Sequence, residues 1–185
     1  MSAIETDRQD TGSAPQVMQD MHWHAMTDDD LPAVTAMAAV LHPDHFEDEA
    51  VFAERLRLYP PGCQVLRAGA QEAGYVISHP WRIGSPPPLN HMLGALPSRP
   101  DTFHLHDLAV LPPARGFGAA GRVIGTLAQR AEAEGCQFLS LVAVGGSETF
   151  WRVHGFVPAE QPPELRSYGD GALYMVRAVR KALRP

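Results

Sequence analysis

The chain has 185 residues, a length that fits one compact domain with a sizeable core. A net charge of −6 gives it no general attraction to nucleic acid or anionic lipid, so neither is an expected partner. The sequence also predicts a cytoplasmic protein with reduced thiols. Its two cysteines lie far apart, no apolar run approaches the length of about 20 residues that spans a bilayer, and the N-terminus lacks the pattern of a signal peptide.

The N-terminal segment and the first strand come before any strong pattern. Residues 1–20 are polar, lack an apolar period, and are predicted to be a disordered leader, which leaves residues 21–185 as a single domain. Residues Met21 to Met26 alternate weakly, and His22 and His24 are interpreted as exposed residues of an edge strand.

Two helices are predicted next. Thr27 and the three aspartates after it form a helix start, and apolar residues at three-and-four spacing predict a helix over Asp29–Leu41. A second helix is predicted over Asp48–Leu58, where Pro60 and Pro61 stop it. The acidic residues between and at the start of these helices, Asp44, Glu47, Asp48 and Glu49, could attract a cationic amine, but a solvated helix start is the favoured interpretation.

A hairpin and a long loop follow the helices. Gln64–Ala68 and Gly74–Ser78 are predicted to pair as strands around a turn at Gly69–Ala73. The segment Gly84–Pro100 carries five of the seventeen prolines, which excludes a central strand or a regular helix throughout. It is predicted to be a loop near the functional site.

The second half of the chain predicts one βαβ crossover and a few short elements. Phe103–Val110 reads as a strand, Ala119–Glu134 as a helix and Phe138–Val144 as a strongly apolar strand. A short helix at Glu148–His154, a strand after Gly155 and a last strand at Ala172–Val179 complete an α/β (α+β) domain.

The decisive stretch is the glycine-rich turn between that strand and helix. Small residues let backbone N–H groups approach an anion, the helix N-terminus adds partial positive charge, and Arg115 adds a full one, so a pyrophosphate is the expected ligand. Gly116, Gly118 and Gly121 also spell the GxGxxG dinucleotide fingerprint, but prolines separate the turn from its strand and no acidic residue ends the next strand. A turn that only packs the helix on the sheet is the remaining alternative.

These residues carry a family resemblance. The string LAVLPPARGFGAAG, Leu108 to Gly121, resembles the acetyl-CoA-binding signature of the GNAT superfamily of N-acetyltransferases, which reads Arg or Gln, two residues, Gly, one residue, and Gly or Ala. Arg115, Gly118 and Ala120 occupy those positions. The string FWRVHGF is similar to the family's second landmark, and the order of elements agrees from about residue 21 to residue 179.

The resemblance implies a fold and a co-substrate. It implies a mixed, mostly antiparallel sheet of about six to seven strands, with helices on both faces and a splay between two central parallel strands that admits the pantetheine arm. It implies acetyl-CoA as co-substrate, without a metal. The residues expected to contact CoA are Leu108, Ala109, Val110, Arg115, Gly116, Phe117, Gly118, Ala119, Ala120, Ser147 and Trp151.

His104 and His106 are the candidate catalytic residues. Two apart on a strand, their side chains leave the same face, whereas Asp107 is expected on the other face. An unperturbed pKa near 6.5 suits an imidazole to take a proton from an ammonium, directly or through water. HLHDLAV also resembles the arylalkylamine N-acetyltransferases, which place paired histidines here as a proton path. There are two alternatives for the pair. It could bind a metal, although no third ligand is evident nearby, or it could have a purely structural role.

The candidate general acid departs from the family. Many relatives place a tyrosine four residues before the Gly-Phe landmark, where this chain has Trp151, and an indole N–H is no proton source at neutral pH. Ser147, Tyr168 and Tyr174 remain as possible donors to the leaving thiolate, and Trp151 either lines the thiol pocket or packs in the core.

The sequence therefore predicts an N-acetyltransferase that moves acetyl from acetyl-CoA to a primary amine, of a small molecule or a peptide, by direct transfer in a ternary complex. The alternative is a non-catalytic acyl-CoA sensor or interaction domain on the same fold. A homodimer also stays open, because the last strand can pair within one chain or between two.

Overall fold

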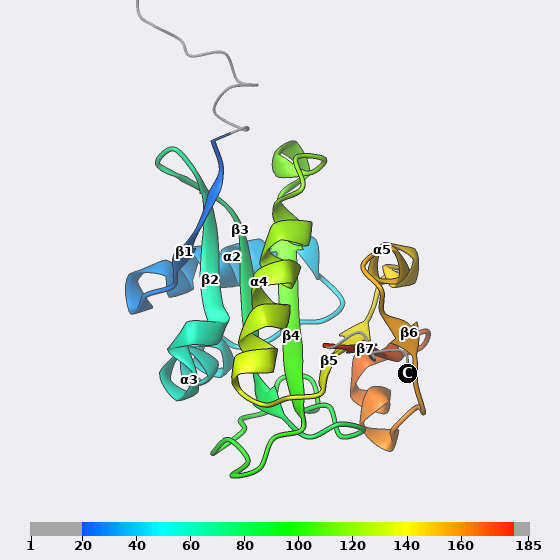
Figure 1. Cartoon of the computed structure of the whole chain (residues 1–185). Coiled ribbons are helices and arrows are strands. Elements are labelled where there is room, and N and C mark those ends of the chain that lie inside the picture. Colours follow the sequence, from blue (N-terminus) through cyan, green and yellow to red (C-terminus); the bar gives the residue numbers. More distant parts are fainter. Residues whose placement is uncertain (1–19, 180–185) are drawn as a thin grey trace, which may run out of the picture.

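The computed structural model describes residues 20–179, so nearly all of the predicted leader lies outside the described residues. Seven strands form one sheet in the order β1-β2-β3-β4-β5-β7-β6 (Figure 1). Their bounds are β1 His22–Ala25, β2 Cys63–Ala68, β3 Gln71–Trp81, β4 Thr102–Val110, β5 Phe138–Ala143, β6 Val157–Pro158 and β7 Leu173–Ala178. The α-helices are α2 Leu31–Leu41, α3 Glu49–Leu58, α4 Ala119–Ala133 and α5 Glu148–Val153. The short 3-10 segments are η1 Asp28–Asp30, η2 Pro60–Gly62, η3 Pro112–Ala114 and η4 Pro163–Tyr168.

The sheet is mixed and mostly antiparallel, as predicted. β4 and β5 form its parallel pair, connected through α4 as a βαβ crossover, and the other neighbours run antiparallel. Parallel pairing covers only Thr102–Leu105 of β4 and Phe138–Leu141 of β5. Residues 106–110 of β4 continue beyond it, which opens the splay that the family resemblance implies at the centre of the sheet.

A bulge in β4 lies where the parallel pairing ends. Ile77 of β3 faces Asp107, but the next residue, Ser78, faces Leu105, so His106 has no partner opposite it. An extra residue in one strand changes the side to which the following side chains point. The bulge therefore shifts by one residue the alternation of β4 side chains between the two faces of the sheet, at the level of the splay.

Helices cover both faces of the sheet. On one face α2 and α3 pack on β2 and β3, where the buried cluster includes Val34, Phe52, Val65, Tyr75 and Ile77. On the other face α4 crosses β4 (Figure 1). Its apolar stripe packs on β4 and β5, and the residues of that core include Phe103, Leu105, Val123, Leu127 and Leu139. Apolar residues at three-and-four spacing give each of these helices one buried side, and these sides cover the two faces of the sheet.

The hairpin is tighter than predicted. Ala68 already pairs with Gln71, so the turn is Gly69 and Ala70, and β3 extends to Trp81 through Pro80. A proline is tolerated because β2 pairs with β3 only as far as Ile77, which leaves the later residues of β3 bonded to β4 alone.

The proline-rich segment contains no helix or strand between residues 82 and 101, in agreement with the sequence. Buried side chains of α3 anchor it. The Glu54 carboxylate accepts hydrogen bonds from the backbone of Leu93 (2.6 Å) and Gly94 (3.0 Å), and Arg55 donates to the carbonyl of His91 (2.8 Å). The loop is thus held in one arrangement beside the splay.

Candidate functional site

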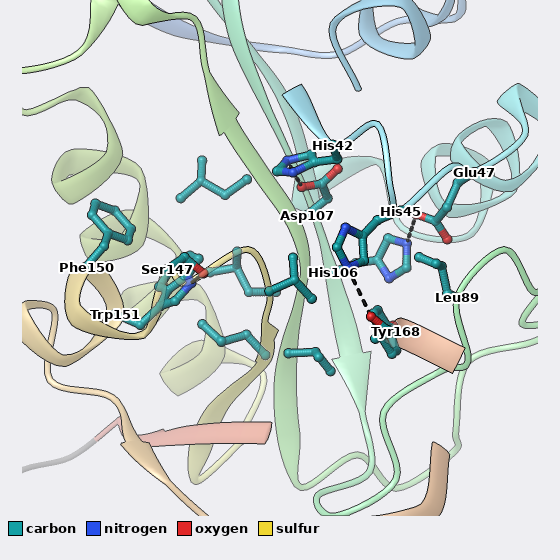
Figure 2. A pocket seen from close by; sticks show the side chains of 15 residues that line it. His42, His45, Glu47, Leu89, His106, Asp107, Ser147, Phe150, Trp151 and Tyr168 are labelled. Carbon is teal, nitrogen blue, oxygen red and sulfur yellow. Dashed lines mark hydrogen bonds and ion pairs between the residues drawn. The ribbon is translucent and has the colours of Figure 1, made fainter. Parts of the chain in front are cut away.

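A cavity of about 140 Å³ opens where β4 and β5 separate. It lies between two unlike walls: His42, Glu47, His106 and Asp107 on one side, and Ser147, Phe150 and Trp151 on the other (Figure 2). The remaining lining residues are His45, Leu89, Leu105, Leu108, Leu141, Val142, Val144 and Tyr168. No Lys or Arg borders this cavity within residues 20–179, so its formal charges are the two carboxylates.

The two candidate catalytic histidines are neighbours, with ring centroids 6.2 Å apart, but they differ in their access to the cavity. His106 borders the cavity, and its Nε2 lies 2.8 Å from Oε2 of Glu47. His104 is 1% exposed, hydrogen-bonds through Nδ1 to the Ser140 hydroxyl (3.1 Å), and does not border the cavity. Burial, together with the neighbouring imidazoles, lowers the pKa of His104 well below its ordinary value. The catalytic assignment of the pair stays a prediction, with His106 as the member that lies at the cavity.

His79, on β3, completes a group of three histidine rings that the sequence did not suggest. Its ring centroid lies 5.7 Å from that of His104 and 6.3 Å from that of His106. Burial lowers the pKa of His79 to about 3, helped by the nearby His106. His79 and His104 are therefore neutral in the folded protein at physiological pH.

The expected position of Asp107 is wrong. Because of the bulge at His106, both His106 and Asp107 reach partners in the segment between α2 and α3. Oδ1 of Asp107 lies 3.3 Å from Nε2 of His42, and Oδ2 accepts a 2.5 Å hydrogen bond from the hydroxyl of Tyr75. Burial alone would raise the pKa of Asp107, but these two partners hold it below its ordinary value. Alternation along an ideal strand could not reveal this side-chain cluster.

Glu47 is a buried functional candidate and not part of a solvated helix start. Its side chain is 5% exposed, and its carboxylate joins His106 to the backbone N–H of Asn90, 3.0 Å away in the proline-rich loop. Burial opposes ionisation, but His106 and the Asn90 N–H keep the pKa of Glu47 below its ordinary value. The acidic run HPDHFEDE did contain this residue, but only the fold distinguishes Glu47 from its exposed neighbours.

A second cavity, of about 580 Å³, adjoins the first. It runs past the splayed end of β4 to the glycine-rich turn and the start of α4. Its lining includes most of the residues that the sequence assigned to CoA: Leu108, Ala109, Val110, Arg115, Gly116, Gly118, Ala119, Ala120 and Ser147. Of the other two, Trp151 borders the smaller cavity, and Phe117 borders neither.

The turn has the geometry of an anion site. Gly116 and Gly118 have φ angles of +86° and +75°, which glycine adopts without the steric cost that a side chain would bring, and Gly118 is the N-cap of α4. The first N–H groups of a helix have no carbonyl of their own helix to bond. Arg115 is held beside them through a 2.9 Å hydrogen bond from Nε to the Val110 carbonyl. The residues present therefore suit a pyrophosphate.

Hydroxyl groups near the junction of the cavities differ in access. Ser147 borders both cavities and accepts a 3.2 Å hydrogen bond from the indole Nε1 of Trp151. Tyr168 borders the smaller one, but its hydroxyl donates to the Pro87 carbonyl (2.7 Å). The Tyr174 hydroxyl accepts from the N–H of Gly84 and reaches neither cavity. Among the three donors that the sequence proposed, Ser147 is the best placed.

Within residues 20–179, no group of three or more His, Cys, Asp or Glu side chains has an arrangement that could hold a metal ion. In the same part of the chain, no helix has the length and apolar character needed to cross a bilayer.

Solved structures with the same fold span nearly the whole chain. Ard1 from Thermoplasma volcanium matches with a TM-score of 0.69 at 14% identity, over 87% of this chain and 99% of that protein. The GNAT-like decarboxylase GphF in complex with isobutyryl-CoA gives 0.69 at 17%, over 86% and 100%. Naa50 from Arabidopsis thaliana in complex with a CoA-peptide bisubstrate analogue gives 0.64 at 14%, over 84% and 96%.

Sequence comparison gives the family directly. Among curated protein sequences, no relative of this chain is found. The sequence pattern of the Acetyltransferase (GNAT) family, however, matches residues 20–156, which is most of the chain and includes the splayed strands, the glycine-rich turn and the Gly-Phe landmark. The chain therefore belongs to the GNAT acetyltransferase family.

Proposed function

We propose that this protein transfers an acyl group, in the simplest case acetyl, from CoA to a primary amine within a ternary complex. The observation that carries the proposal is the meeting of two unlike cavities. One runs along β4 to the glycine-rich turn at the start of α4, and the other contains the buried carboxylates of Glu47 and Asp107 beside imidazoles and apolar side chains. Bringing two substrates together in this way supplies a large part of the rate, because positioning removes much of the entropic barrier.

The larger cavity supports the binding of CoA. The glycine-rich turn and Arg115 suit the pyrophosphate. β4 beyond Leu105 has no strand bonded on the side of the splay, so its backbone N–H and C=O groups can pair with the amides of the pantetheine arm. A backbone N–H near Val110 is then available to stabilise the oxygen of the thioester carbonyl as negative charge develops on it.

The smaller cavity supports an amine as acceptor. It presents the carboxylates of Glu47 and Asp107 and, within the described chain, no Lys or Arg that could pair with an acidic acceptor. Leu105, Leu108 and Leu141 contribute apolar surface beside these charges. A cavity of similar size, about 150 Å³, accommodates a benzene ring. A small amine with a short apolar body and no carboxylate fits both the charge and the size.

The balance of protons defines what the protein must supply. An ammonium loses one proton to become a nucleophile, its nitrogen bonds to the acyl carbon, the carbon–sulfur bond breaks, and a second proton passes to the departing thiolate. The third proton stays on the amide product. Ser147, whose oxygen already accepts a hydrogen bond from Trp151, has its own O–H free to assist the thiolate. A thiol pKa near 8.5 makes weak assistance sufficient.

The experiment is acyl transfer by the purified full-length chain. Acetyl-CoA is supplied with small primary amines and, as a matched set, with the amino acids that bear the same side chains. Release of free thiol and the mass of the acylated product are measured. Transfer to the amines, with transfer to the matched amino acids at least tenfold lower, is expected. CoA binding with no acylation of any amine would favour a non-catalytic acyl-CoA sensor instead.

A further inference from the structure

The junction of the two cavities limits which groups can act on the reacting atoms. The residues that border both cavities are His42, His45, Leu108, Val144, Ser147 and Phe150. Two of these are imidazoles. His45 bonds through Nε2 to the backbone carbonyl of Tyr168 at 3.1 Å, and this neutral partner cannot stabilise a protonated ring as a carboxylate can. His42 is the other.

The carboxylate of Asp107 faces one ring nitrogen of His42. This nitrogen, Nε2, is buried and lies 3.3 Å from Oδ1 of Asp107, an ion-pair distance without the geometry of a hydrogen bond, and the hydroxyl of the fully buried Tyr75 donates to the other oxygen of the same carboxylate. Next to a carboxylate the facing ring nitrogen carries the proton, which leaves Nδ1 of His42 as the nitrogen with the free electron pair. The side chain is 27% exposed, so a ligand in the cavities can reach it.

His106 offers no comparable nitrogen. Its side chain is 1% exposed, its Nε2 faces Glu47, and its Nδ1 is buried without a hydrogen-bond partner. Neither nitrogen is open to a ligand in the cavity. Although both histidines border the same cavity, only His42 combines a free nitrogen with access.

We propose that His42 is the catalytic base that removes the first proton from the ammonium of the acceptor, and that Asp107 and Tyr75 are positioning residues that orient it. This rests on the proposed amine acyltransfer. Nδ1 of His42 takes the proton, the neutral amine attacks the thioester carbonyl, and His42 then returns its proton to the solvent. A carboxylate that holds an imidazole in one tautomer is the same arrangement that activates bases in hydrolases.

The charged neighbours of His42 agree with this role. The Asp107 carboxylate raises the pKa of His42 above its ordinary value, against burial, which lowers it; Glu47 also raises it, and Arg115 lowers it. As the pH falls through this pKa, His42 becomes protonated and can no longer accept. Activity should therefore decline on the acid side with the pKa of His42.

The test is His42→Gln in the full-length protein, because glutamine keeps an N–H group beside Asp107 but cannot act as a base. General base catalysis contributes about 10²- to 10⁴-fold, so kcat/KM near pH 7 should fall at least about 100-fold. The loss should shrink at high pH, where the free amine is abundant, and added imidazole should restore part of the rate. The affinity for CoA should stay within about twofold. His24→Gln, an exposed histidine of β1 that borders neither cavity, is the matched control and should keep the wild-type profile.

A second measurement does not depend on turnover. The ring of His42, followed by NMR in wild type and in Asp107→Asn, should titrate at a lower pH in the variant because the carboxylate that raises its pKa is gone. The fall of kcat/KM at low pH, its acid limb, should also move to a lower pH. A structural role for Asp107 would change stability without moving this limb.

The outcomes separate the two proposals. An active wild type whose His42→Gln variant binds CoA normally and keeps the wild-type rate and pH profile overturns the assignment of His42 and leaves the acyltransferase intact. Loss of the acid limb in His106→Gln, with its retention in His42→Gln, does the same and assigns the base to His106. A wild type that binds CoA but acylates no amine overturns both.

Discussion

The two cavities of this protein are built by different means. Half of the lining of the larger one comes from a single stretch, Leu108 to Ala120, which presents backbone and glycine, and the rest comes from the segments around His42 and Ser147. The smaller one collects His42 and Glu47 from the connection between α2 and α3, His106 and Asp107 from β4, and Trp151 from α5. In the smaller cavity the polar groups are mainly titratable side chains.

This difference determines what each region tolerates. A site of backbone groups is sensitive to conformation and insensitive to the identity of most side chains, because the chain's path places the donors. A site of buried titratable side chains depends on the exact partner of each group, because an unpaired charge in the interior is costly. Mutations should therefore divide into conformational effects near Gly118 and electrostatic effects near His79.

The largest expected effect is conformational. Gly118→Val places a β-branched residue at a φ of +75°, which costs about 1 to 3 kcal/mol or forces the turn to open. The dissociation constant of CoA should rise up to about 100-fold, as measured by calorimetry. Gly125→Ala, in the middle of α4 with open space around it, is the matched control and should leave CoA affinity unchanged. Equal affinity in both variants would show that the turn does not bind the pyrophosphate.

The next effect concerns buried imidazoles. Between pH 6.5 and about 3 His79 is neutral when folded but protonated when unfolded, so the unfolded state binds more protons and stability falls as the pH falls. Each such group contributes about 1.4 kcal/mol per pH unit. His79→Leu should therefore recover about 2 kcal/mol relative to wild type between pH 6.5 and pH 5, measured by urea unfolding.

For this prediction the exposed His24→Leu is the control, and its stability should follow that of the wild type at every pH because its ring faces water in both states. If the wild type and His79→Leu lost stability in parallel, the neutral burial of His79 would be refuted.

A smaller effect is expected at the mouth of the turn. Arg115→Ala removes a guanidinium that is exposed to solvent, so CoA affinity should fall about fivefold and the difference should narrow in high salt. Arg152→Ala, which removes an exposed ion pair with Glu148, serves as the control for loss of positive charge. A loss that does not depend on salt would mean that Arg115 acts by holding the Val110 carbonyl.

The smallest effect lies where the cavities join. Ser147→Ala and Trp151→Phe each remove one end of the 3.2 Å hydrogen bond between these residues, and each should lower kcat about threefold. The double variant should be no slower than either single one, since both changes interrupt the same contact. Additive losses would indicate that the two side chains act separately.

Local sequence determined the main elements of the fold and the glycine-rich part of the larger cavity. The apolar periods located both N-terminal helices, α4, and the central strands within a few residues. The turn around Gly116 and Gly118 could be recognised because its function depends on backbone angles that glycine permits over one short stretch. Resemblance to a known signature added the splay between β4 and β5.

Tertiary structure alone decided the smaller cavity. Ideal alternation placed Asp107 away from His106, whereas the bulge, which depends on how β3 pairs with β4, brings both toward the α2–α3 connection. Glu47 looked like one acid among several until packing buried it against His106 and the proline-rich loop. The physical reason is that partners such as Asp107 and His42 lie far apart in sequence, so their charges and protonation states exist only once the sheet and the connecting segments have assembled.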